Sequence, residues 1–195
     1  MAKRVPLSVL ISAGPTREPL DPVRFISNYS TGYMGAQLAT RALARGHRVT
    51  VVSGPISEPL PPRARVVRVE RSDEMARALR RHAKRADAVI MAAAVADFRP
   101  AHPAAKKLPR RGRMRLTLEA TPEIIGRLPR RARQVVVGFA VESGEVAARA
   151  QRKLRAGDAK HACGKVDIPR KLRLAHHRVK SNGDGRHNFA RPRVL

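Results

Sequence analysis

The sequence has few aromatic residues, no tryptophan and a single cysteine. Aromatic residues make up 3% of its 195 residues, whereas 43% are hydrophobic, so aliphatic side chains and alanine must form the core. The lone Cys163 excludes a disulfide within the chain and a metal site built from several cysteines. These features fit a reducing environment, and we therefore expect a cytoplasmic protein.

Long apolar runs are also missing. No run approaches the ~20 residues that a membrane-spanning helix needs, so we expect no membrane association. The apolar residues near the start, Leu7–Ser12, are few and lead directly into a polar loop. That arrangement is typical of a first strand and not of a signal peptide.

Acidic residues are scarce relative to basic ones. Lys and Arg number 41 against 15 Asp and Glu, which gives a formal net charge of +26. Such a charge favours polyanions or phosphorylated ligands but does not indicate a fold. Because a composition rich in Arg and Ala is also typical of GC-rich genomes, charge alone does not make nucleic acid the expected main partner.

Apolar strand-like runs alternate with amphipathic segments up to about residue 156. Helical spacing of Met34, Leu38 and Ala42 predicts a helix that stops at Gly46. Strands are expected at residues 7–12, 48–53, 64–69, 88–96, 113–119 and 134–140. Helices are expected to begin, with a capping residue, at Thr31, Ser72, Thr121 and Ser143.

This alternation predicts one α/β domain over residues 1–156. The expected fold is three-layered and Rossmann-like, with a mostly parallel sheet and helices on both faces. Ligands of such folds bind at the carboxyl ends of the strands. The segments expected at that edge are residues 14–35, 53–55, 92–99 and 138–142.

Residues 157–195 differ in character from the rest of the chain. They are strongly basic, no apolar run exceeds two residues, and neither helical nor strand periodicity is visible. We expect a basic tail that is disordered or arises from a shifted reading frame. Its histidines and Cys163 have no known metal-site spacing, so we predict no metal site.

The segment of residues 14–35 is polar, rich in Gly and Pro, and lies between the first strand and the first helix. The first loop of this kind is the usual phosphate cradle, because the following helix offers free N–H groups. The helix entrance reads STG (residues 30–32), and Arg17 and Arg24 add fork-shaped cations. Neither a GxGxxG nor a Walker motif is present. A purely structural loop remains an alternative, although a polar loop of about 20 residues is more often functional.

Seven motifs follow one another along the chain. They are TREPLDPVRFISN (16–28), MG (34–35), VSGP (52–55), MAAAVADFRP (91–100), KL (107–108), PEI (122–124) and GFAVE (138–142). In this order they resemble the motifs of the phosphopantothenoylcysteine synthetase family, over roughly residues 5–156. Beyond that point the segments that complete the family's domain are not recognisable, so we expect the domain to be incomplete at its C-terminal end.

The resemblance implies a ligase that joins 4′-phosphopantothenate to L-cysteine in coenzyme A synthesis. CTP, with Mg²⁺, would form an acyl-cytidylate and release pyrophosphate, and the amine of cysteine would then displace CMP. The resemblance also implies a homodimer and a separate flavin-dependent decarboxylase.

Three positions of this sequence match residues that the family uses in catalysis. Asn28 matches the asparagine that holds the acyl-cytidylate, and Arg24 would pair with the substrate phosphate or carboxylate. Lys107 would face the triphosphate. The alternatives are a turn residue at position 28 and a solvated loop lysine at position 107.

Further positions match the family's nucleotide-binding segments. Asp97 would hold ribose hydroxyls or Mg²⁺-bound water, or could instead cap a helix. Phe139 would border the base or belong to the core, and Lys153 would contact the nucleotide or be a helix-surface charge. The remaining positions are Gly14, Thr16, Ser30, Thr31, Gly32, Met91, Ala92, Ala93, Thr121, Pro122, Glu123 and Ile124.

Three other functions compete with the ligase. They are an inactive relative that binds nucleotide only, a basic nucleic-acid-binding protein, and an NAD(P)-binding oxidoreductase. The missing GxGxxG argues against the oxidoreductase. The sequence leaves open whether the nucleotide is CTP or ATP.

Overall fold

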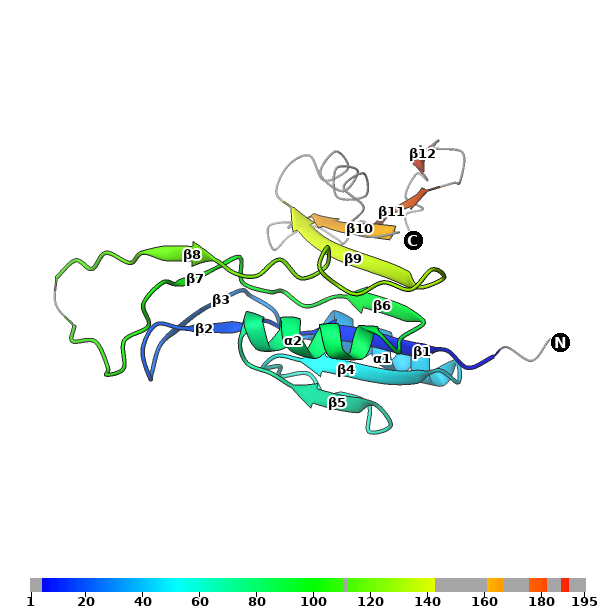
Figure 1. Ribbon diagram of the computed structural model, residues 1–195, viewed down its shortest axis with the longest axis horizontal. Coiled ribbons are helices and arrows are strands. Elements are labelled where there is room, and N and C mark those ends of the chain that lie inside the picture. Colours follow the sequence, from blue (N-terminus) through cyan, green and yellow to red (C-terminus); the bar gives the residue numbers. More distant parts are fainter. Residues whose placement is uncertain (1–4, 111, 143–160, 167–175, 182–186, 190–195) are drawn as a thin grey trace.

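The computed structural model describes residues 5–110, 112–142, 161–166, 176–181 and 187–189. Its main sheet consists of β1 Ser8–Ala13, β4 Arg48–Ser53, β5 Arg65–Arg68, β6 Ala88–Met91, β9 Val135–Glu142, β10 His161–Val166, β11 His176–Ser181 and β12 His187–Phe189. The strand order is β12-β11-β10-β9-β6-β1-β4-β5 (Figure 1). From β10 to β5 all neighbours run parallel, which confirms the expected mostly parallel sheet.

The strand order reverses next to β1. In register, Val9 of β1 lies between Val49 of β4 and Ala88 of β6. The chain builds β4 and β5 on one side of β1 and then crosses over to build β6 and β9 on the other. Such a reversal leaves a crevice at the carboxyl ends of the two central strands, where ligands of open α/β sheets bind. The fold therefore directs attention to the ends of β1 and β6.

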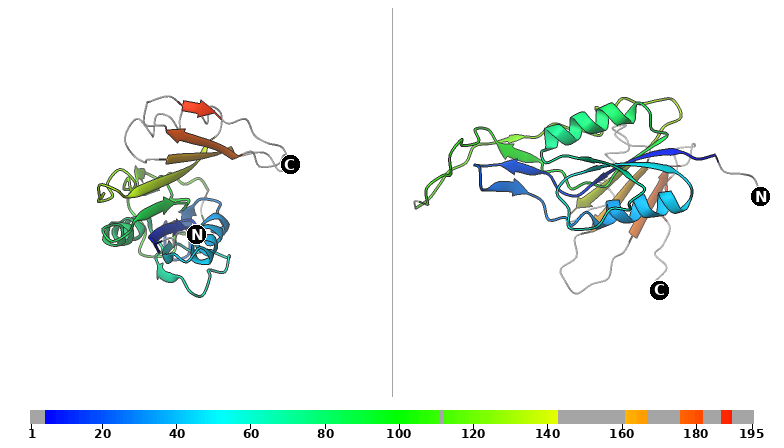
Figure 2. Two further views of the ribbon diagram at one scale, coloured as in Figure 1. Left: turned by 90° about the vertical axis from the view of Figure 1, so that its right-hand side faces the viewer. Right: turned by 90° about the horizontal axis from the view of Figure 1, so that it is seen from below.

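Two helices, α1 Tyr33–Ala44 and α2 Ser72–Ala83, cover opposite faces of the sheet (Figure 2). Successive residues of β1 point to opposite faces. Ile11 joins the cluster that contains Ala39 of α1, and Leu10 joins the cluster that contains Met75 of α2. The three layers and the aliphatic core agree with the sequence.

The ends of the helices agree with the sequence only in part. The expected stop at Gly46 is confirmed, since this glycine has a φ of 80° just after α1. Ser72, expected as the cap of α2, is instead its first helical residue and donates its backbone N–H to Glu18 Oε1 at 2.9 Å. Glu74 accepts the N–H of Arg71, which is the N-cap. The carboxylates of Glu18 and Glu74 therefore accept N–H groups at the start of α2, a role expected for the Ser72 hydroxyl.

Two antiparallel ribbons project from the carboxyl edge of the sheet (Figure 1). One pairs β2 Arg17–Pro19 with β3 Phe25–Ser27, and the other pairs β7 Phe98–Pro100 with β8 Leu118–Ala120. The strands β2 and β7 lie against each other. Part of the segment expected to be an open loop is thus a hairpin.

Two expected strands are shorter in the structure. The run 88–96 forms β6 only as far as Met91, and Ala94 then makes an isolated bridge to Pro15. The run 113–119 contributes only to β8, outside the main sheet. Its alternating apolar side chains are exposed, because no layer covers them: Met114, Leu116 and Leu118.

The helix expected to begin at Thr121 is absent. The segment forms turns, closed by short-range hydrogen bonds such as that from the Arg127 N–H to the Ile124 carbonyl at 3.2 Å. Pro122 and Pro129 leave too few residues between them for a stable helix. That prediction was wrong.

Three strands lie beyond residue 156, where the sequence shows no strand periodicity. β10 is parallel to β9, with His161 beside Val137, and β11 and β12 follow in antiparallel pairing. This pairing uses backbone hydrogen bonds, which side-chain periodicity does not report. The helix expected to begin at Ser143, and Lys153 with it, lies outside the described residues. Within the described ranges, no helix has the length and apolar character to cross a membrane.

Candidate active site at the carboxyl edge of the sheet

Hydrogen bonds join the loops that follow β1 and β6. The Ala94 N–H donates to the Gly14 carbonyl at 2.9 Å, and the Ala96 N–H donates to Thr16 Oγ1 at 3.0 Å. Thr16 is fully buried, so its side chain supports the backbone and does not reach a ligand. These bonds bring Gly14 and Thr16 together with residues 94–96 at the switch point.

Gly14 and Gly32 both lie against the side chain of Ile56. Their φ values are 78° and 86°, in the left-handed region that favours glycine. A Cβ at either position would clash with Ile56 Cγ2. The two glycines thus allow the loop after β1 and the start of α1 to close on the same side chain.

The start of α1 faces this edge without a compensating negative charge. Its N-cap Gly32 has no side-chain cap, and the first turn contains no acidic residue. The hydroxyls of Ser30 and Thr31 accept from the N–H groups of Gly32 and Tyr33 at 3.4 and 3.3 Å, which are long contacts. The positive end of the helix dipole and the first-turn amides can therefore receive an anion.

Asn28 reaches from the end of β3 to the loop after β6. Its Nδ2 donates to the Val95 carbonyl at 2.9 Å and lies 3.5 Å from the Ala94 carbonyl. The side chain is nevertheless exposed. The amide nitrogen carries two hydrogens, so the short contact to the Val95 carbonyl fixes its orientation, and a ligand can replace the long contact to the Ala94 carbonyl.

Arg24 is held by Asp21. Its Nε and Nη2 both donate to Asp21 Oδ2, the former at 2.9 Å, and Nη2 also donates to the Leu108 carbonyl at 2.8 Å. The Arg24 guanidinium holds the pKa of the buried Asp21 carboxyl well below its usual range. The Leu108 N–H donates to the same carboxylate at 3.1 Å. This network fixes the backbone beside Lys107, whose side chain is exposed.

The segment of residues 121–124 is tied to the end of the β6 loop. Thr121 donates its hydroxyl to the Ala96 carbonyl at 2.6 Å and its N–H to the Asp97 carbonyl at 2.9 Å. Asp97 and Glu123 are exposed at this edge. Ile124 is buried in the core cluster of α2, so its side chain does not face a ligand.

Met91 ends β6, and Phe139 lies beside that end, within the neighbouring strand β9. Met91 is the last residue of β6 and pairs in register with Gly138 of β9, so Phe139 comes one residue further along. Ala92 and Phe139 are partly exposed, whereas Met91 is buried. Of these predicted positions, Ala92 and Phe139 can line a ligand site with their side chains.

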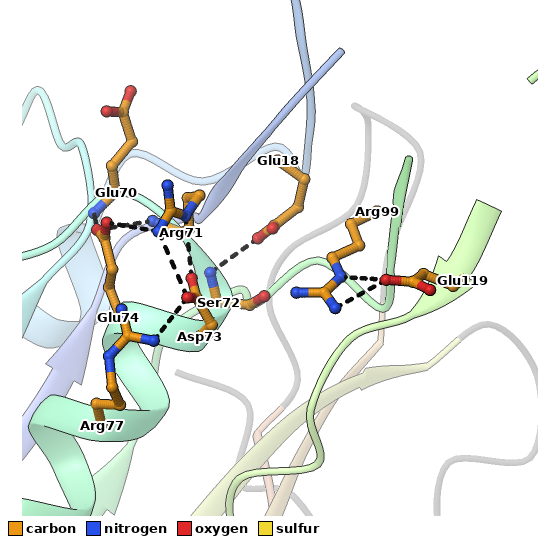
Figure 3. A network of polar contacts seen from close by, with 9 residues as sticks. All are labelled: Glu18, Glu70, Arg71, Ser72, Asp73, Glu74, Arg77, Arg99 and Glu119. Atoms are coloured by element: carbon orange, nitrogen blue, oxygen red, sulfur yellow. Dashed lines mark hydrogen bonds and ion pairs between the residues drawn. The ribbon is translucent and has the colours of Figure 1, made fainter. Parts of the chain in front are cut away.

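Glu18 braces the β2–β3 ribbon against α2 (Figure 3). This carboxylate is 1% exposed, and its Oε1 accepts the Ser72 N–H at the positive end of the helix. In the second ribbon, Arg99 and Glu119 form an ion pair at 2.7 Å between β7 and β8. Glu18 therefore anchors the ribbon that precedes Asn28 to α2, whereas the Arg99–Glu119 pair joins the two strands of its own ribbon.

Most of the chain, residues 6–164, matches the model of the DNA/pantothenate metabolism flavoprotein C-terminal domain. The chain belongs to this family. The match confirms the resemblance carried by the motifs and extends past residue 156 into β10.

Individual members of the family are clearly similar. The chain is 43% identical over 152 residues to the coenzyme A biosynthesis bifunctional protein CoaBC of Vibrio vulnificus (strain YJ016), a match that covers 75% of this chain and 38% of that protein. The chain thus spans well under half of this relative. The crystal structure of the C-terminal domain of a CoaBC is 33% identical, with a TM-score of 0.73 and coverage of 95% of this chain and 86% of that one. A Cab2 mutant in complex with phosphopantothenate-cysteine has the same fold, with a TM-score of 0.73 at 18% identity, and the match covers 95% of this chain and 80% of that one.

Three buried polar residues near the site were not predicted from the sequence: Ser12, Glu18 and Asp21. Ser12 Oγ accepts the Ala93 N–H at 3.1 Å, and Glu18 and Asp21 are described above. Only Asp21 carries a local signal, because Asp before Pro indicates a turn, and its carboxylate accepts the Arg24 N–H at 2.8 Å. The partners of Ser12 and Glu18 are 81 and 54 residues away, where no local pattern points.

Carboxylates at the carboxyl edge are the groups that could hold a metal ion there. In the part of the chain that the structure describes, no three His, Cys, Asp or Glu residues group as metal ligands. Asp97 is an exposed carboxylate at the edge. Mg²⁺ typically takes one or two carboxylates together with phosphates and water. Asp97 could supply one such carboxylate to a metal that is also bound by phosphates and water.

Proposed function

We propose that this chain is a ligase that joins 4′-phosphopantothenate to L-cysteine in coenzyme A synthesis. Support comes from its family, from its likeness to the C-terminal domain of CoaBC, and from the phosphopantothenate-cysteine bound by the Cab2 mutant. The observation that carries the proposal is the amide of Asn28, which is exposed but pinned beside the crevice between β1 and β6.

The reaction takes place in two steps. A carboxylate oxygen of phosphopantothenate attacks the α-phosphorus of CTP, the bond to the β-phosphate breaks, and pyrophosphate leaves. The amine of cysteine then attacks the acyl carbon of the acyl-cytidylate and loses a proton. An amide bond forms, and CMP leaves with the bonding electron pair.

Asn28 stabilises the acyl-cytidylate. Its second Nδ2 hydrogen donates to the phosphodiester or to the acyl oxygen, while the Val95 carbonyl fixes its orientation. A neutral donor suits this position because a carboxylate would repel the phosphate. Preorganised donors of this kind typically accelerate reactions by about 10²–10³-fold.

The triphosphate lies between the start of α1 and the segment of Lys107. The first-turn amides after Gly32 and the ammonium of Lys107 offset its negative charge. Asp97 holds ribose hydroxyls or metal-bound water. Mg²⁺ bound to the triphosphate supplies further charge neutralisation at the leaving pyrophosphate.

The proposal includes partners of this chain. The relative from Vibrio vulnificus is a bifunctional protein, and this chain matches 38% of it. We propose that a separate flavin-dependent decarboxylase acts on the product, that the domain works as a homodimer, and that both act in the cytoplasm.

The test uses the purified full chain with CTP, Mg²⁺, phosphopantothenate and cysteine. Mass spectrometry should detect phosphopantothenoylcysteine and an equal amount of CMP, and ATP in place of CTP should give less product. Asn28→Ala, checked for folding by circular dichroism, serves as the control and should be strongly impaired. A folded wild-type chain that binds CTP but yields no product would instead favour the inactive nucleotide-binding relative.

A further inference from the structure

A cavity opens at the edge of the sheet where the strands begin. Its volume is about 650 Å³, within the range of small-molecule sites. The walls come from the starts of β1, β4 and β5 and from the C-terminal end of α2 with the residues after it. The candidate active site lies at the opposite ends of the same strands, so the two are separate.

The lining of this cavity is strongly basic. Six of its residues carry a full positive charge: Arg48, Arg63, Arg65, Arg81, Lys84 and Arg85. His47 and His82 also line it, and no lining residue is acidic. Arginine forks are suited to binding phosphate oxygens in pairs.

No carboxylate neutralises these cations within the described residues. None of the six takes part in an ion pair there, and Arg48 donates only to the Ser8 hydroxyl, at 3.1 Å. The carboxylate nearest in sequence, Asp87, accepts the Ser8 N–H and pairs with Arg131 at 3.9 Å. Elsewhere on the domain, Arg71, by contrast, pairs with carboxylates.

Helix dipoles do not remove this excess of charge. Both α1 and α2 end at this edge, and each helix C-terminus corresponds to about half a negative charge. Together they amount to roughly one negative charge against six positive ones. The cavity therefore stays strongly positive.

The pKa of His82 reflects the positive charge of the cavity. Burial lowers the pKa of His82, and the nearby guanidinium groups of Arg65, Arg81 and Arg85 lower it further. An anion placed among these groups would relieve their mutual repulsion and restore the imidazolium.

We propose that this cavity binds a small anion with two or more adjacent phosphate groups, at a site distinct from the candidate active site. Several cations around one hollow match several neighbouring negative charges. The lining contains no Phe, Tyr or Trp on which a base could stack, so the phosphates and not a nucleobase are recognised. The absence of stacking partners also argues against single-stranded nucleic acid as the occupant.

The test measures binding of inorganic tripolyphosphate to the full chain by calorimetry at 0.15 M salt. Saturable binding is expected, and Arg65→Ala/Arg81→Ala should weaken it at least tenfold. The matched control is Arg113→Ala/Arg115→Ala, which removes the same charge from exposed positions that do not line the cavity. Lys107→Ala removes a charge from the other edge, and both it and the control should leave this binding site intact.

Independent signals localise the ligand. The His82 resonances should shift on addition of tripolyphosphate, and the apparent pKa of this histidine should rise. The proposal fails if the two double variants lose affinity equally, if only Lys107→Ala loses it, or if a short DNA duplex binds this edge more tightly than tripolyphosphate. Circular dichroism of each variant confirms that lost binding does not reflect unfolding. No outcome depends on ligase activity, so this test is independent of the proposed reaction.

Discussion

At the scale of single residues, the proposed chemistry depends most on Asn28. Its amide is held by the Val95 carbonyl at 2.9 Å, yet the side chain is exposed at the carboxyl edge. The contact that orients the amide also limits which residues can replace Asn28. A carboxylate here would face two backbone carbonyls as well as the phosphodiester of the intermediate.

We predict that Asn28→Asp lowers turnover by about two orders of magnitude or more, as expected for loss of a preorganised donor. Asn28→Ala removes the donor without adding charge, so it should be impaired but less so than Asn28→Asp. Steady-state kinetics of both variants and their melting temperatures test this. Equal losses in both, or a loss that follows the melting temperature, would make Asn28 a structural turn residue.

Lys107 and its neighbour Lys106 offer a matched pair, since both are exposed lysines on one segment. Lys107→Ala should weaken CTP binding by roughly 1.5–3 kcal/mol, the cost of one charge-assisted contact. Lys106→Ala should leave the affinity unchanged. Calorimetric titration with CTP distinguishes the two variants. Equal affinities for CTP would mean that Lys107 is a solvated lysine that does not contact the nucleotide.

Residue identities at the site could be predicted where a motif names them, but their contacts could not. Arg24 was expected to face substrate, whereas the structure gives it Asp21 and the Leu108 carbonyl as partners. Thr16 was expected to contact nucleotide, whereas its buried hydroxyl accepts the Ala96 N–H. Asp21 lies three residues from Arg24 and carries a local turn signal, but Leu108 and Ala96 lie 84 and 80 residues from their partners, where no local pattern points.

At the scale of elements, the junction between the β1 loop and α1 depends on glycine. Gly32→Ala should destabilise the domain by about 1–3 kcal/mol beyond the cost of the left-handed backbone, because its Cβ meets Ile56. Gly46→Ala has a similar φ but nothing within 4 Å of the added Cβ, so it isolates the backbone cost of about 1–2 kcal/mol.

Urea denaturation of the two variants measures this difference. Adding Ile56→Ala to Gly32→Ala should recover part of the loss, since it removes the contacted atoms. If the two glycine variants lose the same stability, Ile56 does not restrict this junction.

The first turn of α2 should respond to acid. Burial alone would raise the pKa of Asp73, but hydrogen bonds from Arg71 and Arg77 lower it to about 2. A lowered folded pKa stabilises the protein above the ordinary value of 3.8. That contribution is lost as the pH falls from about 4 to about 2.

Asp73→Asn should therefore be about 1 kcal/mol less stable than wild type at pH 6, as expected for a surface ion pair. The difference should shrink as the pH falls to about 2, where Asp73 is half protonated in the folded protein, and it should vanish below that pH. Because all other groups titrate in both proteins, the difference in unfolding free energy isolates Asp73. A difference that persists unchanged at low pH would contradict the assignment.

Elements with strong periodicity were predictable, and the others were not. The strands β1, β4, β5 and β9 and both described helices follow from apolar runs and helical spacing. The ribbons are only three residues per strand, too short to show a period. β10 to β12 lie in a basic segment without alternating apolar residues, so their backbone pairing leaves no side-chain pattern in the sequence.

At the scale of the whole molecule, the positive charges differ in their surroundings at the two edges of the sheet. At the carboxyl edge lie the first-turn amides of α1 and the exposed amide of Asn28. At the amino edge, six cations surround a hollow of about 650 Å³, and none of them is in an ion pair within the part of the chain that the structure describes. The composition predicts affinity for anions. Only the fold shows that the candidate active site and the basic cavity lie at opposite edges of the sheet.

The central claim is that this chain activates phosphopantothenate with CTP before cysteine takes part. The most direct test is exchange of labelled pyrophosphate into CTP by the purified full chain. The label should enter CTP when phosphopantothenate and Mg²⁺ are present and cysteine is absent, and it should not enter without phosphopantothenate. Exchange that requires cysteine, or exchange that proceeds without phosphopantothenate, would contradict the proposed acyl-cytidylate.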